Sequence, residues 1–581
     1  MRDRDRPVLI LGAGINGAAL ARELVLNGVA VCVVDVGDIS SGTTACSTRL
    51  IHGGLRYLEY AEWGLVRESL HERTRWLRLA PHLVRPLRLF VPVGNRPGGL
   101  GRTARRLLHM EGARPAAGDP RGLWLVRAGL RLYDQFARDP ALPRSTVHRV
   151  GDAGTPEVDP ARFRWLCSYS DAQARFPELL TVALLEDARQ AAAERGVAWQ
   201  VLPYHAARLH GARVAVHRRD PFTTAGPVTI GPAVQDLEPL AIVNATGAWV
   251  DRTLQHLPVD ARRLIGGTKG SHLLTFHPGL RRALAGAGLY VEAADGRPVF
   301  LLPLGDATLV GTTDLPFEGD PAEARASEEE LDYLLSAANA TCPGLRLSRD
   351  DIALHYCGVR PLPYSPARAT AGITRRHWLE EHAAARPLFS LVGGKLTTCR
   401  ALAEQATRAV LDRVGLTVRD NSRERPLPGA AGWPQGEVEA EGQAARLAAQ
   451  FGVPRRQAQQ MALLAGSRVA DILAAGVDPR CSPGPELPLP SDFVRWVIRS
   501  QWVTTLGDLV ERRLMLLYEP ELSAAALHAL AELMRQEGVL AAEQVPLQVA
   551  ACRDRLRNRF GKELTAAAGD SPVTDGAPRA T

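Results

Sequence analysis

The stretch from residue 7 to residue 35 constrains the fold more than any other part of the chain. It begins with the apolar run Val8 to Leu11 and continues with the turn Gly12-Ala13-Gly14-Ile15-Asn16-Gly17, which helix-forming residues follow. A second apolar run, Val29 to Val34, comes after the helix-ending pair Asn27-Gly28. This order of strand, G-x-G-x-x-G turn, helix and strand predicts a Rossmann-like unit that binds a dinucleotide.

The three glycines and the acid at the end of the second run suit a ligand that carries phosphate and ribose. Gly12 permits the tight turn, Gly14 lets the backbone approach a pyrophosphate, and Gly17 lets helix and strand pack closely. The helix N-terminus supplies unpaired N–H groups and a positive potential. Asp35 stands where a carboxylate accepts hydrogen bonds from a ribose. The alternative is a plain glycine turn between core elements, but strand, helix, strand and acid in this order favour the ligand site.

Length and composition limit the architecture. A chain of 581 residues is expected to form two or three domains. Because the sequence has no apolar run of about 18 residues, we expect no membrane-spanning helix. The charged start, Met1 to Arg6, leads directly into the first strand, so we expect no secretory signal.

The eight cysteines are scattered and form no C-x-x-C pair. This spacing argues against a zinc site, a cysteine-held iron–sulfur cluster and a disulfide framework, and we predict no metal site. The same usage of cysteine fits a reducing cytoplasm.

Arginine carries almost all of the positive charge. The formal net charge is +7 and the pI is about 9.1, yet lysine occurs only at Lys269, Lys395 and Lys562. A lysine in such a chain marks a position that suits a compact ammonium group. The basic balance suits an anionic membrane surface, and we find no motif for nucleic acid.

Residues 49–59 carry the run RLIHGGLRYLE. Together with GAGINGA at residues 12–18, this run closely resembles the FAD-dependent glycerol-3-phosphate dehydrogenases of the respiratory, quinone-reducing type. The resemblance implies that the Ser/Thr-rich loop 40–48 and the glycines that follow pass under the flavin. It also implies that Arg56 and Tyr57 contact the phosphate end of glycerol 3-phosphate, a role that suits a guanidinium group.

Three later motifs extend the resemblance. NATGAW at residues 244–249 follows an apolar strand and resembles a second flavin-contact motif of glutathione-reductase-like and amino-acid-oxidase-like flavoproteins. KGSH at 269–272 and GTTD at 311–314 match motifs of the family, which places a histidine, here His272, near the substrate. A histidine can act as a base at neutral pH, although a single histidine is more often structural.

Two more motifs add cations. GVRP at 358–361 offers Arg360 as an anion ligand, and LVGGKLTTCR at 391–400 reads as strand, glycine pair and helix. A helix that starts at Gly393-Gly394 would aim its N-terminal amides at a flavin carbonyl, with Lys395 and Arg360 adding positive charge.

The resemblance thus implies three sets of site residues. The catalytic residues are His272, Arg360 and Lys395. The substrate-binding residues are Arg56, Tyr57, Arg360 and Lys395. The cofactor-binding residues are Gly12, Gly14, Asn16, Gly17, Asp35, Thr48, His52, Gly53, Gly54, Thr246, Gly247, Asp314, Gly394, Lys395, Leu396 and Thr397.

Residues 169–178 depart from the family pattern. The family carries a Tyr-x-Asp segment followed by an Asp-Asp-Ala-Arg run that opens a helix. This chain has Tyr169-Ser170-Asp171 and then Arg175-Phe176-Pro177-Glu178, so the acidic pair is lost and glutamate replaces the arginine. If this run shapes the active site, the departure affects substrate or turnover but not FAD binding.

Leu123 to Tyr133 is amphipathic, with apolar residues set among Arg127 and Arg131. Such a segment can lie in a membrane interface with its arginines at anionic head groups, or it can be a helix packed on the core. The peripheral attachment of the family to membranes favours the interface. The Gly-, Pro- and Arg-rich residues 95–122 are expected to form a loop.

We predict an α/β fold. An FAD-binding, Rossmann-like domain of the glutathione-reductase and D-amino-acid-oxidase type carries an antiparallel-sheet substrate domain and precedes an all-helical C-terminal domain. The oxidoreductase region covers 1–420, with FAD-binding parts near 1–90, 150–255 and 350–420 and substrate parts near 91–149 and 256–349. Residues 421–436 are expected to form a linker, 437–565 the helical domain and 566–581 a disordered tail.

The predicted reaction is the oxidation of sn-glycerol 3-phosphate to dihydroxyacetone phosphate, with hydride passing to the flavin and electrons then to membrane quinone. Three alternatives stay open. They are an oxygen-using glycerol-3-phosphate oxidase, an amine or amino-acid-oxidase-like flavoenzyme with another substrate, and a flavin-bearing membrane adaptor that has lost turnover. We expect a cytoplasmic protein attached peripherally to the inner face of the cell membrane, without a nucleic-acid partner, and a homodimer is compatible with the sequence.

Overall fold

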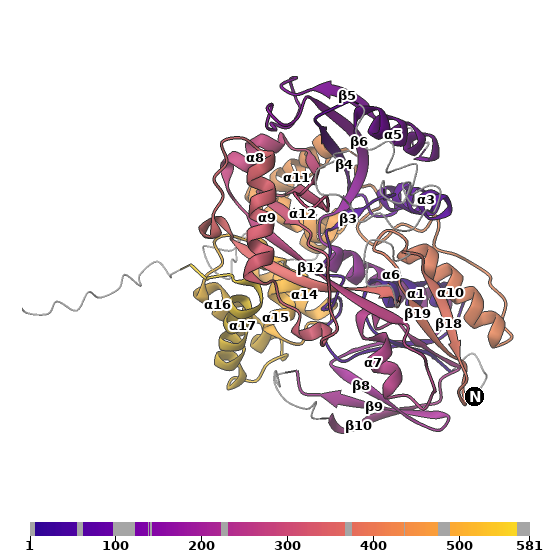
Figure 1. The fold of residues 1–581 in the computed structure, drawn as a ribbon. Helices are drawn as coiled ribbons and strands as arrows, with labels where there is room; N and C mark the ends of the chain where they lie inside the picture. The colour runs from indigo at the N-terminus through magenta and orange to yellow at the C-terminus, as the bar shows by residue number, and fades with distance from the viewer. Residues whose placement is uncertain are drawn as a thin grey trace, which may run out of the picture. The chain divides into compact units, whose positions relative to one another are not determined.

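The computed structural model describes residues 6–54, 62–96, 122–137, 139, 142–221, 230–365, 375–434, 436–474 and 489–565 (Figure 1). Contacts divide the chain into two compact units, residues 1–440 with 465–468, and residues 441–464 with 469–581. Arg56, Tyr57 and most of the loop expected at 95–122 lie outside the described residues.

A six-stranded sheet forms around the N-terminal strand. Its order is β18–β19–β11–β1–β2–β7, and its pairs are parallel except that β18 runs antiparallel to β19. The strands are β1 (Val8–Leu11), β2 (Val31–Asp35), β7 (Trp199–Pro203), β11 (Ala241–Asn244), β18 (Trp378–His382) and β19 (Leu388–Val392). The strand, glycine turn, helix and strand expected at the N-terminus are therefore confirmed.

Helices and a second, smaller sheet cover this sheet. α1 (Ile15–Leu26) packs on β1 and β2 and against α6 (Pro177–Arg195) and α10 (Cys399–Arg413). An antiparallel sheet of β8 (His205–His210), β9 (Arg213–Arg219) and β10 (Ile230–Leu237) shares an apolar cluster with Leu9, Leu11 and α7 (Val250–Gln255). β1 is apolar throughout, and all of its residues are buried. Because successive residues of a strand point to opposite faces, both faces of β1 are covered.

A ten-stranded sheet makes up the rest of the first unit. Its order is β16–β12–β15–β14–β13–β4–β6–β3, with β17 also paired to β12 and β5 to β6. The strands are β3 (Leu50–Ile51), β4 (Val84–Val93), β5 (Thr146–Arg149), β6 (Trp165–Ala174), β12 (Ile265–Thr275), β13 (Gly288–Glu292), β14 (Pro298–Leu304), β15 (Ala307–Gly311), β16 (Leu315–Pro316) and β17 (Leu354–Pro363). α8 (Pro278–Leu284) and α9 (Glu328–Thr341) share an apolar cluster with its central strands, and α9 begins with a capping box formed by Ser327 and Glu330.

This larger sheet draws strands from ranges that the sequence pattern places in the FAD-binding parts. β4 pairs with β6 over ten residues, from Val84 opposite Ala174 to Val93 opposite Trp165. β17 pairs with β12 over a similar length, from Ile265 opposite Pro363 to Leu274 opposite Leu354. The two sheets are thus interleaved along the chain instead of occupying separate stretches.

The amphipathic stretch at 123–133 forms α5 (Leu123–Ala137), which packs against β6 and α3 (Trp63–Leu79). Its apolar face, formed by Leu123, Val126, Leu130 and Tyr133, is buried. Trp124 is 54% exposed. Arg127 and Arg131, which lie beyond it in the helix, are also exposed. The main apolar face of this helix is therefore used for packing within the protein.

The stretch expected to be a linker has no helix or strand, yet residues 421–434 are packed on the first unit. Leu427 and Trp433 are buried, and the Arg425 guanidinium lies 3.0 Å from the Asp187 carboxylate of α6. The Ser422 N–H donates to the buried Glu23 carboxylate of α1. Side-chain bonds to α1 and α6 thus replace regular structure in this segment.

The second unit is helical, as predicted. The helices are α11 (Glu437–Phe451), which begins in the first unit, α12 (Arg455–Ala465), α13 (Val469–Ala474), α14 (Ser491–Ser500), α15 (Leu506–Asp508), α16 (Ala524–Gln536) and α17 (Gln544–Phe560). A π-helical turn, Leu509–Arg513, carries the buried Glu511, which is bonded to Arg512 and Arg555. Arg512 also binds Asp508 of the Thr505–Asp508 capping box, so the buried charges of Asp508, Glu511 and Arg512 are paired with one another.

We predict that Gly17→Ala and Gly14→Ala act differently on the protein without cofactor. A Cβ at Gly17 would lie 2.0 Å from the Gly12 carbonyl oxygen, whereas one at Gly14 would first meet the Thr44 hydroxyl at 3.4 Å. Overpacking costs about 1–3 kcal/mol, so Gly17→Ala should lower the Tm and Gly14→Ala should leave it unchanged. Calorimetry of both apoproteins measures this, and equal Tm values would contradict the argument.

Candidate active site

Three of the predicted cofactor motifs meet at the N-terminus of α1. Gly12 has a φ of +107°, and a Cβ there would lie 2.8 Å from the Ala245 carbonyl oxygen, so the turn of NATGAW lies against the glycine turn. A Cβ at Gly394 would lie 2.5 Å from the Asn16 amide nitrogen. The turns after β1, β11 and β19 are thus in contact, as the resemblance to flavoproteins implies.

The N-terminus of α1 fits the pyrophosphate of FAD. Its N-cap residue is Gly14, which has no side chain to cap the helix, and the Ile15 N–H donates to the Thr44 hydroxyl at 3.2 Å. The Asn16 side-chain oxygen is buried and has no hydrogen-bond partner among the described residues. An uncapped helix start with room for backbone approach suits an anion, and the orphaned amide oxygen can accept a bond from the ligand.

Asp35 braces the glycine turn. Its two carboxylate oxygens accept the N–H groups of Ala13 at 2.7 Å and Gly37 at 2.8 Å. Burial raises the pKa of Asp35 to about 6, although these two hydrogen bonds act in the opposite direction. Because each carboxylate oxygen has a second lone pair, the residue can brace the turn and still accept a ribose hydroxyl.

His272 lies in β12, where it is 1% exposed. Its Nε2 is 2.9 Å from the Thr48 hydroxyl of the Ser/Thr-rich loop, and its ring stacks on Tyr356 at a centroid distance of 4.9 Å. Burial, followed by the guanidinium groups of Arg360 and Arg49, lowers the pKa of His272 well below its usual range. The imidazole is therefore neutral at physiological pH, and its Nδ1 has no partner among the described residues.

The residues of the departure at 175–178 lie around Arg49. The Arg49 guanidinium is fully buried and forms two bonds with Glu178, at 2.9 and 3.1 Å. It also donates to the Arg175 carbonyl at 2.8 Å and lies over the rings of Phe176 and Tyr356. Glu178 thus neutralises a buried arginine beneath the His272–Tyr356 stack.

Arg360 and Asp314, predicted as separate substrate and cofactor contacts, form an ion pair at 3.2 Å. The Arg360 guanidinium also donates to the Thr312 hydroxyl at 2.7 Å and the Thr313 carbonyl at 3.0 Å. It crosses the backbone of KGSH at Gly270, where a Cβ would lie 2.1 Å from a guanidinium nitrogen. In the same way Gly311 of GTTD leaves room for His272, whose ring would lie 2.2 Å from a Cβ there.

The helix expected to begin at Gly393-Gly394 begins later, so that expectation is wrong. α10 starts at Cys399, and residues 393–398 form a loop. Gly393 and Gly394 have φ values of +75° and +96°, which no right-handed helix contains. A loop, and not a row of helical amides, therefore carries Lys395, Leu396 and Thr397.

The loop 393–398 is held to α3 and to the end of β3. The Thr397 carbonyl accepts the Trp76 indole N–H at 3.0 Å, and the His52 N–H donates to the Thr397 hydroxyl at 3.1 Å. Burial, followed by the ammonium group of Lys395, lowers the pKa of His52 to about 3. The predicted residues His52, Lys395 and Thr397 therefore lie together.

Sequence reasoning missed a buried network beneath Gly53. The Gly53 N–H donates to the Tyr133 hydroxyl at 2.9 Å, and Tyr133 donates to the Asp171 carboxylate at 2.6 Å. Arg73 of α3 completes the network with a 3.0 Å bond to Asp171. Only the Tyr-x-Asp segment signalled it, because the amphipathic pattern of Leu123 to Tyr133 indicates a membrane interface or core packing and not a polar network.

The remaining predicted residues occupy turns. Gly54 and Gly247 have φ values of +74° and +59°, and the Thr246 hydroxyl donates to the Asn244 side chain at 2.6 Å. Within the described part of the chain we find no cluster of metal-ligating side chains, and no helix is long and apolar enough to cross a membrane. The described cysteines are free thiols.

The interleaved sheets and the glycine-lined turns define the class, an FAD-dependent oxidoreductase. A model of the FAD dependent oxidoreductase family matches residues 7–407, and a model of the C-terminal domain of alpha-glycerophosphate oxidase matches residues 421–545.

Two relatives and one solved structure narrow the class. A glycerol-3-phosphate dehydrogenase of Synechocystis is 33% identical over 541 residues, which cover 87% of this chain and 88% of the relative. A D-erythritol 1-phosphate dehydrogenase of Brucella abortus is 30% identical over 521 residues, which cover 87% and 93%. The glycerol-3-phosphate dehydrogenase of Bacillus halodurans complexed with FAD shares the fold at a TM-score of 0.68 and 22% identity, over 96% of this chain and 95% of that one. The chain belongs to the FAD-dependent glycerol-3-phosphate dehydrogenase family.

We predict that Glu178→Ala strongly destabilises the protein. Removing this carboxylate leaves the Arg49 guanidinium buried without a counter-charge, which costs about 3–5 kcal/mol in the free energy of unfolding. Glu238→Ala is the matched control, because its partner Arg213 is 69% exposed and such pairs contribute about 0–1 kcal/mol. Urea unfolding of both variants measures the difference, and similar losses would contradict the assignment.

Proposed function

We propose that the protein oxidises sn-glycerol 3-phosphate to dihydroxyacetone phosphate at FAD and passes the electrons to membrane quinone. The observation that carries this proposal is the 33% identity to the Synechocystis glycerol-3-phosphate dehydrogenase along most of both chains. The departure at 175–178 does not argue against it, because Glu178 is buried against Arg49.

Arg360 and Lys395 are proposed to bind the phosphate or the hydroxyls, together with Arg56 and Tyr57. Arg360 is held in place by Asp314 and Thr312, which leaves its planar group oriented for an anion while its charge is partly balanced. Lys395 follows two glycines in a loop that is held to α3 through the Thr397 carbonyl. Several cations around one site suit a phosphorylated substrate better than an amine or amino acid.

His272 is proposed to accept the hydroxyl proton. Its neutral imidazole has the protonation state that a base needs. Because His272 is buried behind the half-buried Thr48, the proton would reach Nε2 through the Thr48 hydroxyl. Tyr356 stacks on the His272 ring, and the Arg49 guanidinium lies over Tyr356, so this stacking limits the rotation of the imidazole.

FAD, when bound, supplies the hydride acceptor. The turns that would hold it carry Gly12, Gly14, Gly17 and Asn16 at the pyrophosphate and Asp35 at the ribose. Thr48, His52, Gly53, Gly54, Thr246, Gly247, Asp314, Gly394, Leu396 and Thr397 would complete its surroundings. The contacts among the turns support this placement.

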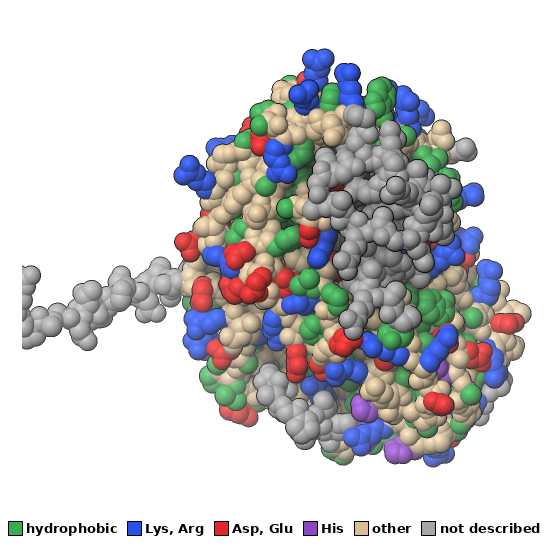
Figure 2. Space-filling view, viewed as in Figure 1, with side chains coloured by type: hydrophobic (Ala, Val, Ile, Leu, Met, Phe, Trp, Pro, Cys, Tyr) green, Lys and Arg blue, Asp and Glu red, His purple; other side chains and the backbone are tan. Residues whose placement is uncertain are grey.

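The proposal also names an electron acceptor and a location in the cell. Relatives named as dehydrogenases favour quinone, whereas the match at 421–545 carries the description of an oxidase. We propose peripheral attachment to the inner face of the cell membrane, with Trp124 and the arginines of α5 as contacts. On the face that Figure 2 shows, basic side chains are interspersed with acidic ones, so binding would depend on local groups more than on overall charge.

We predict that glycerol 3-phosphate bleaches the visible flavin bands of the purified protein under anaerobic conditions. Unphosphorylated glycerol, the matched control, should not, because the cations then have no anion to bind. A quinone analogue should restore the bands faster than dissolved oxygen does.

Other results would redirect the proposal. Bleaching by D-erythritol 1-phosphate alone would assign the substrate of the Brucella relative, and peroxide formed at the full rate would assign an oxidase. A flavin spectrum that no polyol phosphate bleaches would contradict the proposed reaction.

We predict that His272→Asn slows flavin reduction about 10²–10⁴-fold while the Kd of glycerol 3-phosphate changes little. Because burial lowers the pKa of His272, the wild-type rate should show no step near pH 6.5 from this residue. Stopped-flow absorbance from pH 6 to 8 measures both. His277→Asn, at the N-cap of α8, is the control, because asparagine keeps that cap. An unchanged rate in His272→Asn would rule out the role.

A further inference from the structure

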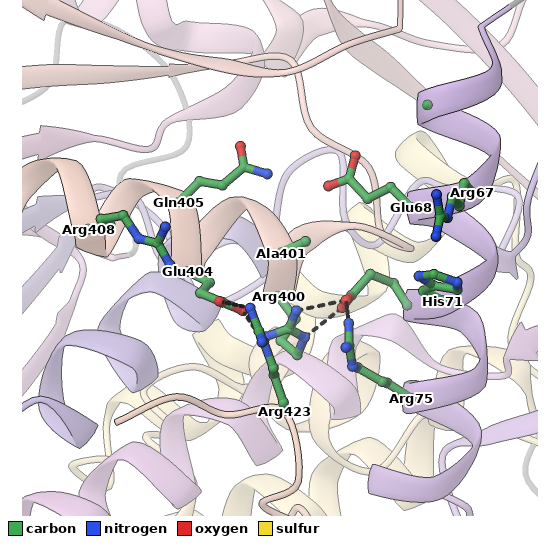
Figure 3. A pocket seen from close by; sticks show the side chains of 12 residues that line it. Arg67, Glu68, His71, Arg75, Arg400, Ala401, Glu404, Gln405, Arg408 and Arg423 are labelled. Carbon is green, nitrogen blue, oxygen red and sulfur yellow. Dashed lines mark hydrogen bonds and ion pairs between the residues drawn. The ribbon is translucent and has the colours of Figure 1, made fainter. Parts of the chain in front are cut away.

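A pocket of about 520 Å³ lies between α3 and α10 (Figure 3). Most of the side chains that line it are arginines and glutamates. Arg400 is bonded to Glu72 at 2.6 and 2.7 Å and to Glu404 at 2.9 Å, and Arg423 also binds Glu404. These carboxylates are therefore neutralised by guanidinium groups within the pocket.

Glu68 also lines this pocket but belongs to a different group of charges. Figure 3 shows it apart from the bonded set around Arg400 and Glu404. Glu68 contacts the His377 imidazole, whose Nε2 lies 3.5 Å from a Glu68 carboxylate oxygen. One Glu68 oxygen is buried, while the side chain as a whole is 28% exposed toward the pocket.

The face of α3 that carries Glu68 forms hydrogen bonds with the segment that follows Lys395. Residues 68, 72 and 76 follow at intervals of four and so share one helix face. Glu72 binds Arg400 and Trp76 binds the Thr397 carbonyl, which are the two ends of the segment 397–400. Glu68 lies one turn earlier on this face, where it lines the pocket with Arg400 and Ala401.

His377 connects Glu68 to the same loop through the backbone. A Cβ at Gly393 would lie 2.8 Å from the Arg376 carbonyl oxygen and 3.5 Å from the Cα of His377. His377 is thus packed on the glycine pair that precedes Lys395. Its side chain is 4% exposed, so Glu68 is in contact with a buried group at the base of the loop.

The pKa shifts agree with this geometry. Burial and the Glu72 carboxylate raise the pKa of Glu68, while Lys395 and Arg400 act in the opposite direction. Burial and Lys395 lower the pKa of His377. Lys395 therefore acts electrostatically on both Glu68 and His377, and because the pKa of His377 is lowered, Glu68 is the member of this pair that can carry a charge.

We propose that Glu68 is a positioning residue that acts through Lys395 and reduces the positive potential at the flavin. The inference rests on FAD lying beside residues 393–397, as proposed above. FAD gains negative charge when it is reduced, so a carboxylate near Lys395 makes the cofactor harder to reduce and easier to reoxidise. The Glu68 side chain is 28% exposed, so water in the pocket can hydrate its carboxylate.

The test is the reduction potential of bound FAD at pH 8.5, measured against a reference dye under anaerobic conditions. Glu68→Gln should shift the equilibrium about tenfold toward reduced FAD, which is about 30 mV for a two-electron couple. Glu404→Gln, which makes the same change in the same pocket, should shift it less than about threefold because Glu404 faces Arg400 and Arg423. Glu68→Asp should stay within the same limit, since it keeps the charge.

A double-mutant cycle identifies the route. In a Lys395→Met background, Glu68→Gln should lose most of its effect, because the group through which it acts is gone. An unchanged potential in Glu68→Gln, an equal shift in Glu404→Gln, or a full shift without Lys395 would overturn the proposal. The readout needs no substrate, so a failed glycerol 3-phosphate assay leaves it interpretable, and the visible spectrum reports FAD binding in each variant.

Discussion

The site depends on the close packing of backbone at the start of α1. Gly17 lies against the Gly12 carbonyl, Gly12 against the turn after β11, and Gly394 against Asn16. No Cβ fits at these three glycines, so three turns from distant parts of the sequence come within van der Waals distance. The nucleotide-binding sheet, the loop with Lys395 and the second flavin motif take their relative positions from this packing.

The first strand, turn and helix could be predicted because their signal is local. The spacing of the glycines and the apolar runs on both sides identify this unit within about thirty residues, and the structure has it at β1, α1 and β2. The motifs of the second sheet were also recognisable. The structure explains two of their glycines, because Gly270 and Gly311 leave the space that Arg360 and His272 occupy.

The sequence could not reveal contacts between distant segments. The ten-residue pairing of β4 with β6 joins strands about eighty residues apart, and no periodicity marks such a partner. Likewise, the sequence patterns of α3 and α5 are ordinary amphipathic ones, yet Arg73 and Tyr133 of these helices hold the backbone of Gly53 together with Asp171. The start of α10 was misplaced because two glycines beside a helix pattern resemble a helix start, while their positive φ values form a loop.

The buried pair of Arg49 and Glu178 has a consequence for exchanging segments between relatives. In the family pattern an arginine stands where this chain has Glu178. Placing that arginine alone at position 178 of this chain would put two guanidinium groups in one buried space beneath Tyr356, with no carboxylate between them. The two positions therefore form a single inherited unit, and a chimaera has to carry both from the same parent.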